Sequence, residues 1–497
     1  CCVIYAFDES PVEAGVLWAG TNDGLVQVSR DNGVSWTDVT RNMPDLPPDG
    51  VVRSIDASRY EAGKAYVVIE HHQVGDFEPR AYRTDDYGES WTSITNGIDD
   101  GVLSYTRSIH EDPVRPGLLY LGTEASLYFS MDDGDSWQSL HTNLPHTPMY
   151  GLVVQEHFND LVVGTYGRGF WILDDIPPLQ QLTTEIAERS AHLFEPRAAY
   201  RFRPISEPYA MSDDQTDGDN PPPGASINYW LSGSVEGEAE IEISNATGEV
   251  VRALEGTTED GVNRVWWNLQ GEALAEVRLR TKPLFADDLE LGEDRVRPFP
   301  GGGPLGAGGP SILQPPGTYT VTLRVNGETF SQSLEVRKDP NSEGSLADVR
   351  AQFAMLQDIR ADADSAVAMI NQIESVRRQL LDTRAVLEEQ GSHEEIVATA
   401  DSLDQKLIEV EQGLFQMRST GTGQDQIRYP SRLMARLSYL FNTVGIADFT
   451  PTDQQGEVHV ILRERLALIA VALDEVMSDD LEEFNRLIQA LGMRVVS

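Results

Sequence analysis

Three aspartates occupy the same place in a repeated octapeptide, and they are the first candidates for chemistry in this chain. The octapeptide occurs as SRDNGVSW, TDDYGESW and SMDDGDSW. A carboxylate can serve a glycosidase, bind a hard cation such as Ca²⁺, or accept backbone N–H groups in a turn. The repeated positions are Asp31, Gly33 and Trp36, then Asp86, Gly88 and Trp91, then Asp132, Gly134 and Trp137.

The residues around each aspartate favour the turn. The glycine permits a positive φ, and the tryptophan can begin a strand and fill space against a neighbouring sheet. Neither role needs a substrate. The clustered carboxylates of DD and DGD keep Ca²⁺ binding as an alternative, although their spacing is not that of an EF-hand. We therefore expect the octapeptides to be structural turns at the rim of a repeated fold.

A second chemical candidate lies in the segment TYGRGFW. A sialidase needs a tyrosine nucleophile and an arginine cluster that holds the substrate carboxylate. Tyr166 and Arg168 are residues of these types, and we expect them to bind a ligand. Earlier repeats place Arg80, Arg83 and Arg107 at positions that we interpret as comparable, although no spacing compels a triad. In the alternative interpretation, the flanking glycines make a tight bend and Arg168 pairs with an acid.

Two adjacent histidines, His71 and His72, lie in an insertion of the second repeat and are candidates for ligand binding. In a strand their side chains point to opposite faces, so they do not easily chelate one ion. A metal site would need His110 or His157 in addition. The sequence lacks the Gly-x-Ser-x-Gly elbow, the His-Glu-x-x-His motif, the phosphate-binding loop and the dinucleotide fingerprint of other enzyme classes.

The repeats define the first of three regions, residues 1–185. Each repeat consists of short β-branched and aromatic runs broken by Gly, Asn and Asp, which is typical of strands and turns. A period near ~45 residues, with about four strands in each repeat, predicts the blades of a β-propeller. We expect three full blades and a last partial blade.

The second region, residues 190–340, is predicted to be a β-sandwich of immunoglobulin-like type. It contains alternating apolar runs and the Asn/Gly turns NATGE and VNGET, with no helical pattern between them. Two loops, 212–224 and 297–317, are rich in Gly and Pro, and we expect them to be either disordered or packed-down connectors.

The third region, residues 344–497, shows apolar residues at three- and four-residue steps and predicts a bundle of four to five antiparallel helices. We expect Ser392 to open a capping box, as the first residue of SHEE. Pro451 is predicted to start a later helix, and the acids of SDDLEEF are predicted to lie in the first turn of the last one.

The charge of the chain limits its partners. Eighty acidic residues against 38 basic ones give a net charge of −42, which repels nucleic acid and anionic membranes. Such a surface suits cations, basic partners or a salty medium, as in a marine or halophilic organism. No apolar run approaches the ~18 residues of a membrane span. Cys1 and Cys2 are adjacent and are not expected to pair, although terminal thiols could bind metal or carry lipid.

The octapeptide resembles the Asp-box, or BNR repeat, of sialidases, xyloglucan-degrading hydrolases and sortilin-type receptors. The order of the regions is similar to that of large bacterial sortilin-like or BNR-repeat glycosyl hydrolases, through VVGTYGRGFWILDD, PPGTYTVTLRVNG and the tail FNRLIQALG. The resemblance covers essentially the whole chain. It implies a multidomain, mainly β protein with a partial Asp-box β-propeller, an immunoglobulin-like β-sandwich and an α-helical bundle. It also implies a secreted, periplasmic or cell-surface protein of a bacterium.

The number of repeats departs from those relatives. Sortilin-type propellers have more blades, and few propellers close with fewer than about four. Because the chain starts within a repeat, we expect a missing N-terminal propeller portion, or another chain, to complete the ring. An unclosed propeller would expose sheet faces and edges.

Two functional hypotheses follow. In the first, the chain is a non-catalytic binding or scaffold module for a protein, peptide or polysaccharide, and its helical region braces it or makes a homo-oligomer. In the second, it is a glycoside hydrolase that acts on a polysaccharide through carboxylates on the propeller axis. No cofactor other than Ca²⁺ is expected.

Overall fold

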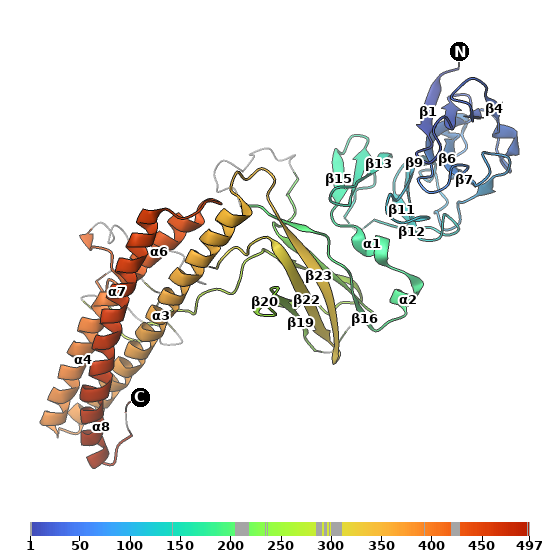
Figure 1. Ribbon diagram of the computed structural model, residues 1–497. Helices are drawn as coiled ribbons and strands as arrows, with labels where there is room; N and C mark the ends of the chain where they lie inside the picture. Colours follow the sequence, from blue (N-terminus) through green and yellow to red (C-terminus); the bar gives the residue numbers. More distant parts are fainter. Residues whose placement is uncertain are drawn as a thin grey trace.

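The computed structural model shows three successive groups of elements along an extended molecule: small antiparallel sheets, a two-sheet layer, and long helices (Figure 1). The prediction of a mainly β fold with a C-terminal helical region is therefore confirmed. The structure describes residues 2–141, 143–203, 218–233, 235, 237–284, 291–292, 296–297, 299, 311–391, 393–418, 428–494 and 496. Ser392 of the predicted capping box, residues 212–217 of the first predicted loop, and residues 298 and 300–310 of the second predicted loop lie outside these residues.

Four sheets occupy the N-terminal part, and in each of them the strands follow one another in chain order as an antiparallel meander. The first sheet contains β1 (Ile4–Glu9), β2 (Leu17–Thr21), β3 (Val26–Ser29) and β4 (Thr37–Asp38). The second contains β5 (Val51–Ala57), β6 (Ala65–Glu70), β7 (Ala81–Thr84) and β8 (Thr92–Ser93). The third contains β9 (Thr106–Glu111), β10 (Leu119–Thr123), β11 (Leu127–Ser130) and β12 (Gln138–Ser139). The fourth contains β13 (Met149–Gln155), β14 (Asp160–Thr165) and β15 (Phe170–Leu173).

Consecutive sheets pack face to face. The first strand of each later sheet packs on the first two strands of the sheet before it. Asp8 and Asp56, at the same position of two first strands, each accept a backbone N–H from the next first strand, from Ala57 and Glu111, at 2.7 Å. All six residues of β6 are buried because its sheet is covered on both faces, which explains its continuous apolar run.

The meander gives every sheet two distinct ends. The octapeptides join the third strand to the fourth, at the same end as the turn between the first and second strands. Backbone hydrogen bonds connect the two turns in all three sheets, for example from Asp133 N to Gly117 O at 2.9 Å. We call this the octapeptide end. The opposite end carries the starts of the first strands and the turns between the second and third strands.

Two sheets with a common apolar core form the middle layer. Short helices α1 (Pro177–Gln181) and α2 (Thr184–Ala187) lead into it. The smaller sheet is β16 (Ala191–Leu193), β18 (Ala225–Leu231) and β21 (Gly261–Trp267). The larger is β17 (Ala199–Arg201), β23 (Glu328–Lys338), β22 (Gly317–Val325), β19 (Ala239–Ser244) and β20 (Val250–Gly256). The NATGE and VNGET turns connect the hairpins β19–β20 and β22–β23, as predicted.

The helical region consists of α3 (Leu346–Glu389), α4 (Glu394–Leu414), α6 (Leu433–Gly445), α7 (Asp453–Glu475), the π-helical segment η3 (Val476–Asp480) and α8 (Leu481–Ala490). Two helix starts differ from prediction. Thr452 caps α7, so Pro451 lies outside the helix. SDDLEEF does not start a separate helix, because α7, η3 and α8 form one continuous helical path. None of the helices in the described ranges is both long enough and apolar enough to span a bilayer.

Candidate functional site

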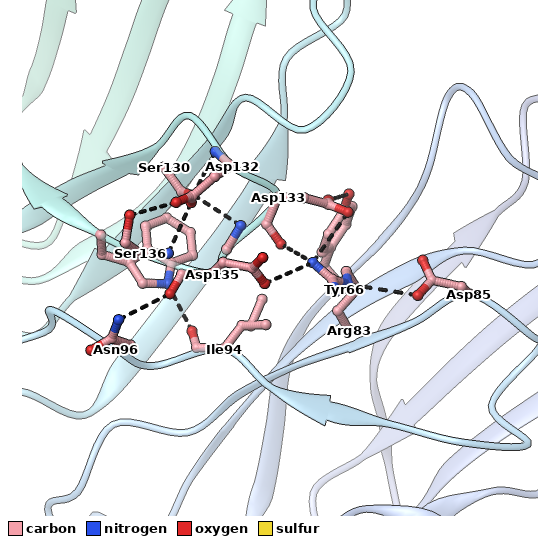
Figure 2. Close-up of polar contacts among 12 residues, drawn as sticks. Tyr66, Arg83, Asp85, Ile94, Asn96, Ser130, Asp132, Asp133, Asp135 and Ser136 are labelled. Carbon is pink, nitrogen blue, oxygen red and sulfur yellow. Dashed lines mark hydrogen bonds and ion pairs between the residues drawn. The ribbon is translucent and has the colours of Figure 1, made fainter. Parts of the chain in front are cut away.

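The octapeptide aspartates are fully engaged in their own turns. In the third octapeptide, Asp132 Oδ1 accepts hydrogen bonds from Ser136 N at 2.8 Å and Ser130 Oγ at 2.7 Å, and Oδ2 accepts one from Ser136 Oγ at 2.6 Å (Figure 2). The same three bonds recur in the other two octapeptides. Gly33, Gly88 and Gly134 have φ values of 82°, 83° and 89°, which explains the repeated glycine.

The same turns attach each sheet to the one before it. Trp137 Nε1 donates to the Ile94 carbonyl at 2.7 Å, and Asp133 accepts from Tyr66 OH and from Arg83 (Figure 2). Trp91 meets Trp18 edge to face. These contacts support a structural role for the octapeptides, since each aspartate lies in a different sheet and bonds only to its own turn.

A different feature repeats at the opposite end. Each first strand carries a β-bulge near its start, where one residue has no partner in the register of the second strand. A bulge redirects the side chain of its extra residue. The four extra residues are Tyr5, Arg53, Arg107 and Tyr150.

The two arginines share one buried carboxylate. Arg53 Nε pairs with Glu70 Oε1, and Arg107 Nη1 lies 2.7 Å from Glu70 Oε2. Arg107 Nε also lies 2.6 Å from Glu124 Oε2. The Glu70 side chain has no exposed surface, so both of its oxygens are used inside the protein. Burial acts to lower the pKa of Arg107, but the bond to Glu124 and the charges of both glutamates raise it overall.

Aromatic rings surround these ion pairs. Arg53 donates to Tyr5 OH at 2.7 Å. The Arg107 guanidinium lies over the rings of Tyr105 and Tyr150, at 4.6 and 4.9 Å from their centroids. The rings of Tyr150 and Tyr166 are 5.5 Å apart, and His72 stacks on Tyr105 at 4.9 Å. We call this set the arginine–tyrosine cluster: Tyr5, Arg53, Glu70, His72, Tyr105, Arg107, Glu124, Tyr150 and Tyr166.

The structure brings together two of the four residues that the sequence proposed for binding. Tyr166 and His72 belong to the cluster. His72 Nδ1 lies 2.8 Å from Glu70 Oε2, although the angle is not that of a hydrogen bond. His71 is buried elsewhere, with Nε2 3.0 Å from the Pro47 carbonyl. Arg168 is exposed, and no acid in the described ranges forms an ion pair with it. The alternative interpretation, in which Arg168 pairs with a nearby acid, therefore gains no support from these residues.

The expected equivalence of three arginines is also wrong. Arg80 precedes β7 and pairs with Asp76, whereas Arg83 lies within β7 and bonds to the third octapeptide. Of these three arginines, only Arg107 lies on a first strand. The equivalent residues could have been found by aligning three similar segments, DESPVEAG (residues 8–15), DASRYEAG (56–63) and HEDPVRPG (110–117). Tyr5, Arg53 and Arg107 each stand three residues before the start of one segment.

The described residues do not form a cluster of metal-ligand side chains. Nowhere in the described ranges do three His, Cys, Asp or Glu side chains gather in a way that could hold one. His110 pairs with Asp56 at 3.2 Å, and His157 lies 3.1 Å from Tyr200 OH, so neither joins His71 or His72.

Comparisons with known proteins give only weak similarities. No protein-family model matches the sequence, and no curated protein matches it either. YCF48 from Cyanidioschyzon merolae is 12% identical over 68% of this chain and 85% of that chain, with a TM-score of 0.26. The GH74 enzyme of Niastella koreensis is 11% identical over 67% of this chain and 45% of that chain, with a TM-score of 0.29. At these TM-scores neither similarity carries an argument about this chain.

The third octapeptide predicts a specific dependence of stability on pH. Burial raises the pKa of Asp132, but its bonds to Ser136 and Ser130 lower it overall. Its stabilisation is therefore present above the unfolded pKa, near pH ~4, and lost as the pH falls through the lower folded pKa. Replacing Asp132 by Asn should lower the Tm by about 2–4 °C at pH 7, and by less at pH 3.

Thermal scans of both proteins across pH 3–8 measure this effect. Asp135→Asn is the control, because Asp135 lies in the same turn, is exposed and has only a 3.4 Å contact with Arg83. A Tm difference for Asp132→Asn that stays the same at all pH values would contradict the assigned role of the carboxylate.

Proposed function

We propose that this chain is a non-catalytic binding module and that a polypeptide ligand contacts the arginine–tyrosine cluster. The observation that carries the proposal is the repeated bulge, which presents a Tyr or Arg side chain from each of four sheets at the same end. Bulges are enriched beside functional sites, and Tyr and Arg are among the residues that contribute most to protein interfaces.

The charge balance of the cluster indicates what it offers a ligand. The guanidiniums of Arg53 and Arg107 are already paired with Glu70 and Glu124, so the cluster is not a trap for a free anion. Its exposed members are aromatic, including Tyr5, Tyr150 and Tyr166. Rings held by cation–π and ring contacts lose little conformational entropy on binding.

Hydrolysis of a glycan fits these contacts less well. A glycosidase needs two carboxylates that reach the substrate, one of them able to donate a proton. Glu70 is inaccessible and surrounded by donors, and Glu124 is held by Arg107. We therefore treat glycan hydrolysis as the alternative, and the experiments below include a result that would support it.

The finer architecture is part of the same proposal. The meander order and the packing of each first strand on the previous sheet support propeller blades. In the middle layer the first, third and sixth strands form one sheet and the others form the second, with β17 parallel to β23. This order supports an immunoglobulin-like sandwich.

The outer faces of the first and fourth sheets are proposed to dock onto further sheets. Residues at equivalent positions differ in their exposure. Phe7 of the first sheet is 56% exposed, whereas Ile55 of the second sheet and Ile109 of the third are 7% and 3% exposed. Trp36 is 38% exposed, against 7% and 4% for Trp91 and Trp137. On the fourth sheet, Phe170 and Ile172 are exposed. In a solution of this chain without other proteins, the partner that presents matching sheet faces is a second copy of the chain.

The binding proposal is tested with peptides selected from a phage-displayed random library on the immobilised chain. We expect Tyr150→Ala and Tyr166→Ala each to weaken the selected peptides about tenfold or more, as the loss of an interface hot spot does. Tyr439→Ala is the matched control, since Tyr439 on α6 is 71% exposed and Tyr166 is 73% exposed. Isothermal titration gives the affinities.

Two results would overturn the binding proposal. One is a set of selected peptides whose affinity is unchanged by both cluster variants. The other is release of reducing ends from soluble polysaccharides that Glu124→Gln abolishes, because this would assign hydrolysis to the same end of the sheets.

The docking proposal is tested by sedimentation equilibrium of the full chain. We expect an average mass above 55.0 kDa that rises with concentration. Phe7→Asp and Phe170→Asp should reduce the association, whereas Ile446→Asp should not, because exposed Ile446 lies beside α6 and away from the sheets. A single 55.0 kDa species at every concentration would exclude docking through these faces.

A further inference from the structure

A cavity of about 390 Å³ that is open to solvent lies in the helical region, apart from the arginine–tyrosine cluster. It is formed where the end of α4, the start of α6 and the middle of α7 meet. Its volume falls within the range of ~300–1,000 Å³ that small-molecule sites occupy. The lining residues are Gly413, Pro430, Ser431, Arg432, Leu433, Arg436, Arg465, Leu468 and Ile469.

Three of the lining residues are arginines, and none is acidic. This is unusual in a chain with 80 acidic and 38 basic residues. Elsewhere the arginines commonly pair with acids; Arg463, two residues before Arg465 on α7, lies 3.0 Å from Asp362. Within the described ranges, Arg432, Arg436 and Arg465 make no ion pair, and Arg436 Nε donates only to the Ser431 carbonyl at 3.2 Å.

The position of Arg465 on α7 explains why it finds no acid on its own helix. On a helix, a side chain pairs with residues three or four positions away. Around Arg465 these positions hold Ile461, Leu462, Leu468 and Ile469, all apolar. Like charges held around one cavity repel, and an anion placed among them removes the repulsion.

The rest of the lining is apolar. Leu433 is buried, Ile469 is half-buried, and Leu468 remains exposed although it lies on the cavity wall. An occupant with an apolar part would cover Leu468 and gain the free energy of removing that surface from water. A purely ionic occupant would leave this wall exposed.

We propose that the cavity binds a small anionic amphiphile, with an acidic group among Arg432, Arg436 and Arg465 and an apolar body against Leu468 and Ile469. Guanidinium groups hold carboxylates and phosphates through paired N–H donors, so either acidic group fits. This site does not depend on the function proposed for the sheets.

Isothermal titration of the full chain tests the proposal with four probes: octanoate, octyl phosphate, inorganic phosphate and hexanol. We expect one octanoate or octyl phosphate to bind per chain, and the Kd values for inorganic phosphate and hexanol to be at least about tenfold higher, since each lacks one of the two contacts. The relative affinities of octanoate and octyl phosphate show which acidic group is preferred.

Matched variants locate the binding. Arg465→Gln and Arg436→Gln should each weaken octanoate binding about tenfold, which is the loss of one charge-assisted hydrogen bond. Arg463→Gln removes the same charge two residues away, outside the cavity, and should leave the Kd unchanged. Circular dichroism checks that each variant is folded.

Three outcomes would overturn the proposal. The first is no saturable octanoate binding to the folded chain. The second is equal affinity for octanoate and inorganic phosphate, which would leave the apolar wall without a role. The third is an equal effect of Arg463→Gln and Arg465→Gln, which would indicate general charge attraction and not a site.

Discussion

The extra residue of the β-bulge near the start of each first strand determines where the arginine–tyrosine cluster lies. In a regular strand, side chains alternate between two faces, and in the second and third sheets both faces are covered by neighbouring sheets. A charged arginine placed there would be buried without water. The bulge moves Arg53 and Arg107 out of this alternation and towards Tyr5, Tyr150 and the acids around them.

Glu70 makes this arrangement stable. It follows the apolar residues of β6 at the edge of the buried core and neutralises two guanidiniums that come from different sheets. A buried charge is tolerated only when it is paired and hydrogen-bonded, so Glu70, Arg53 and Arg107 must be present together. The octapeptides act independently at the other end, where their aspartates hold turns. The repeat thus separates the turns that hold the sheets from the cluster that we propose contacts a ligand.

Local signals in the sequence predicted local structure well. The octapeptide turns and the Asn/Gly hairpin turns depend on residues within a few positions of one another, so their residue types were sufficient. The bulges depend on the register between two strands, which no short segment encodes. Glu70 was missed because its partners lie 17 and 37 residues away in the chain. The helix start predicted at Pro451 is too early, because Thr452 supplies the actual cap and α7 begins at Asp453.

A double-mutant cycle between Glu70 and Arg107 measures the central claim most directly. The free energies of unfolding of the wild type, Glu70→Gln, Arg107→Met and the double variant are obtained from denaturant titrations followed by tryptophan fluorescence. Each single change removes one of two ion-pair partners of a buried charge, because Glu70 keeps Arg53 and Arg107 keeps Glu124. The account therefore predicts a coupling energy of about 2 kcal/mol or more between Glu70 and Arg107. A coupling energy below about 0.5 kcal/mol would contradict it, since the two side chains would then not form the buried pair on which the cluster rests.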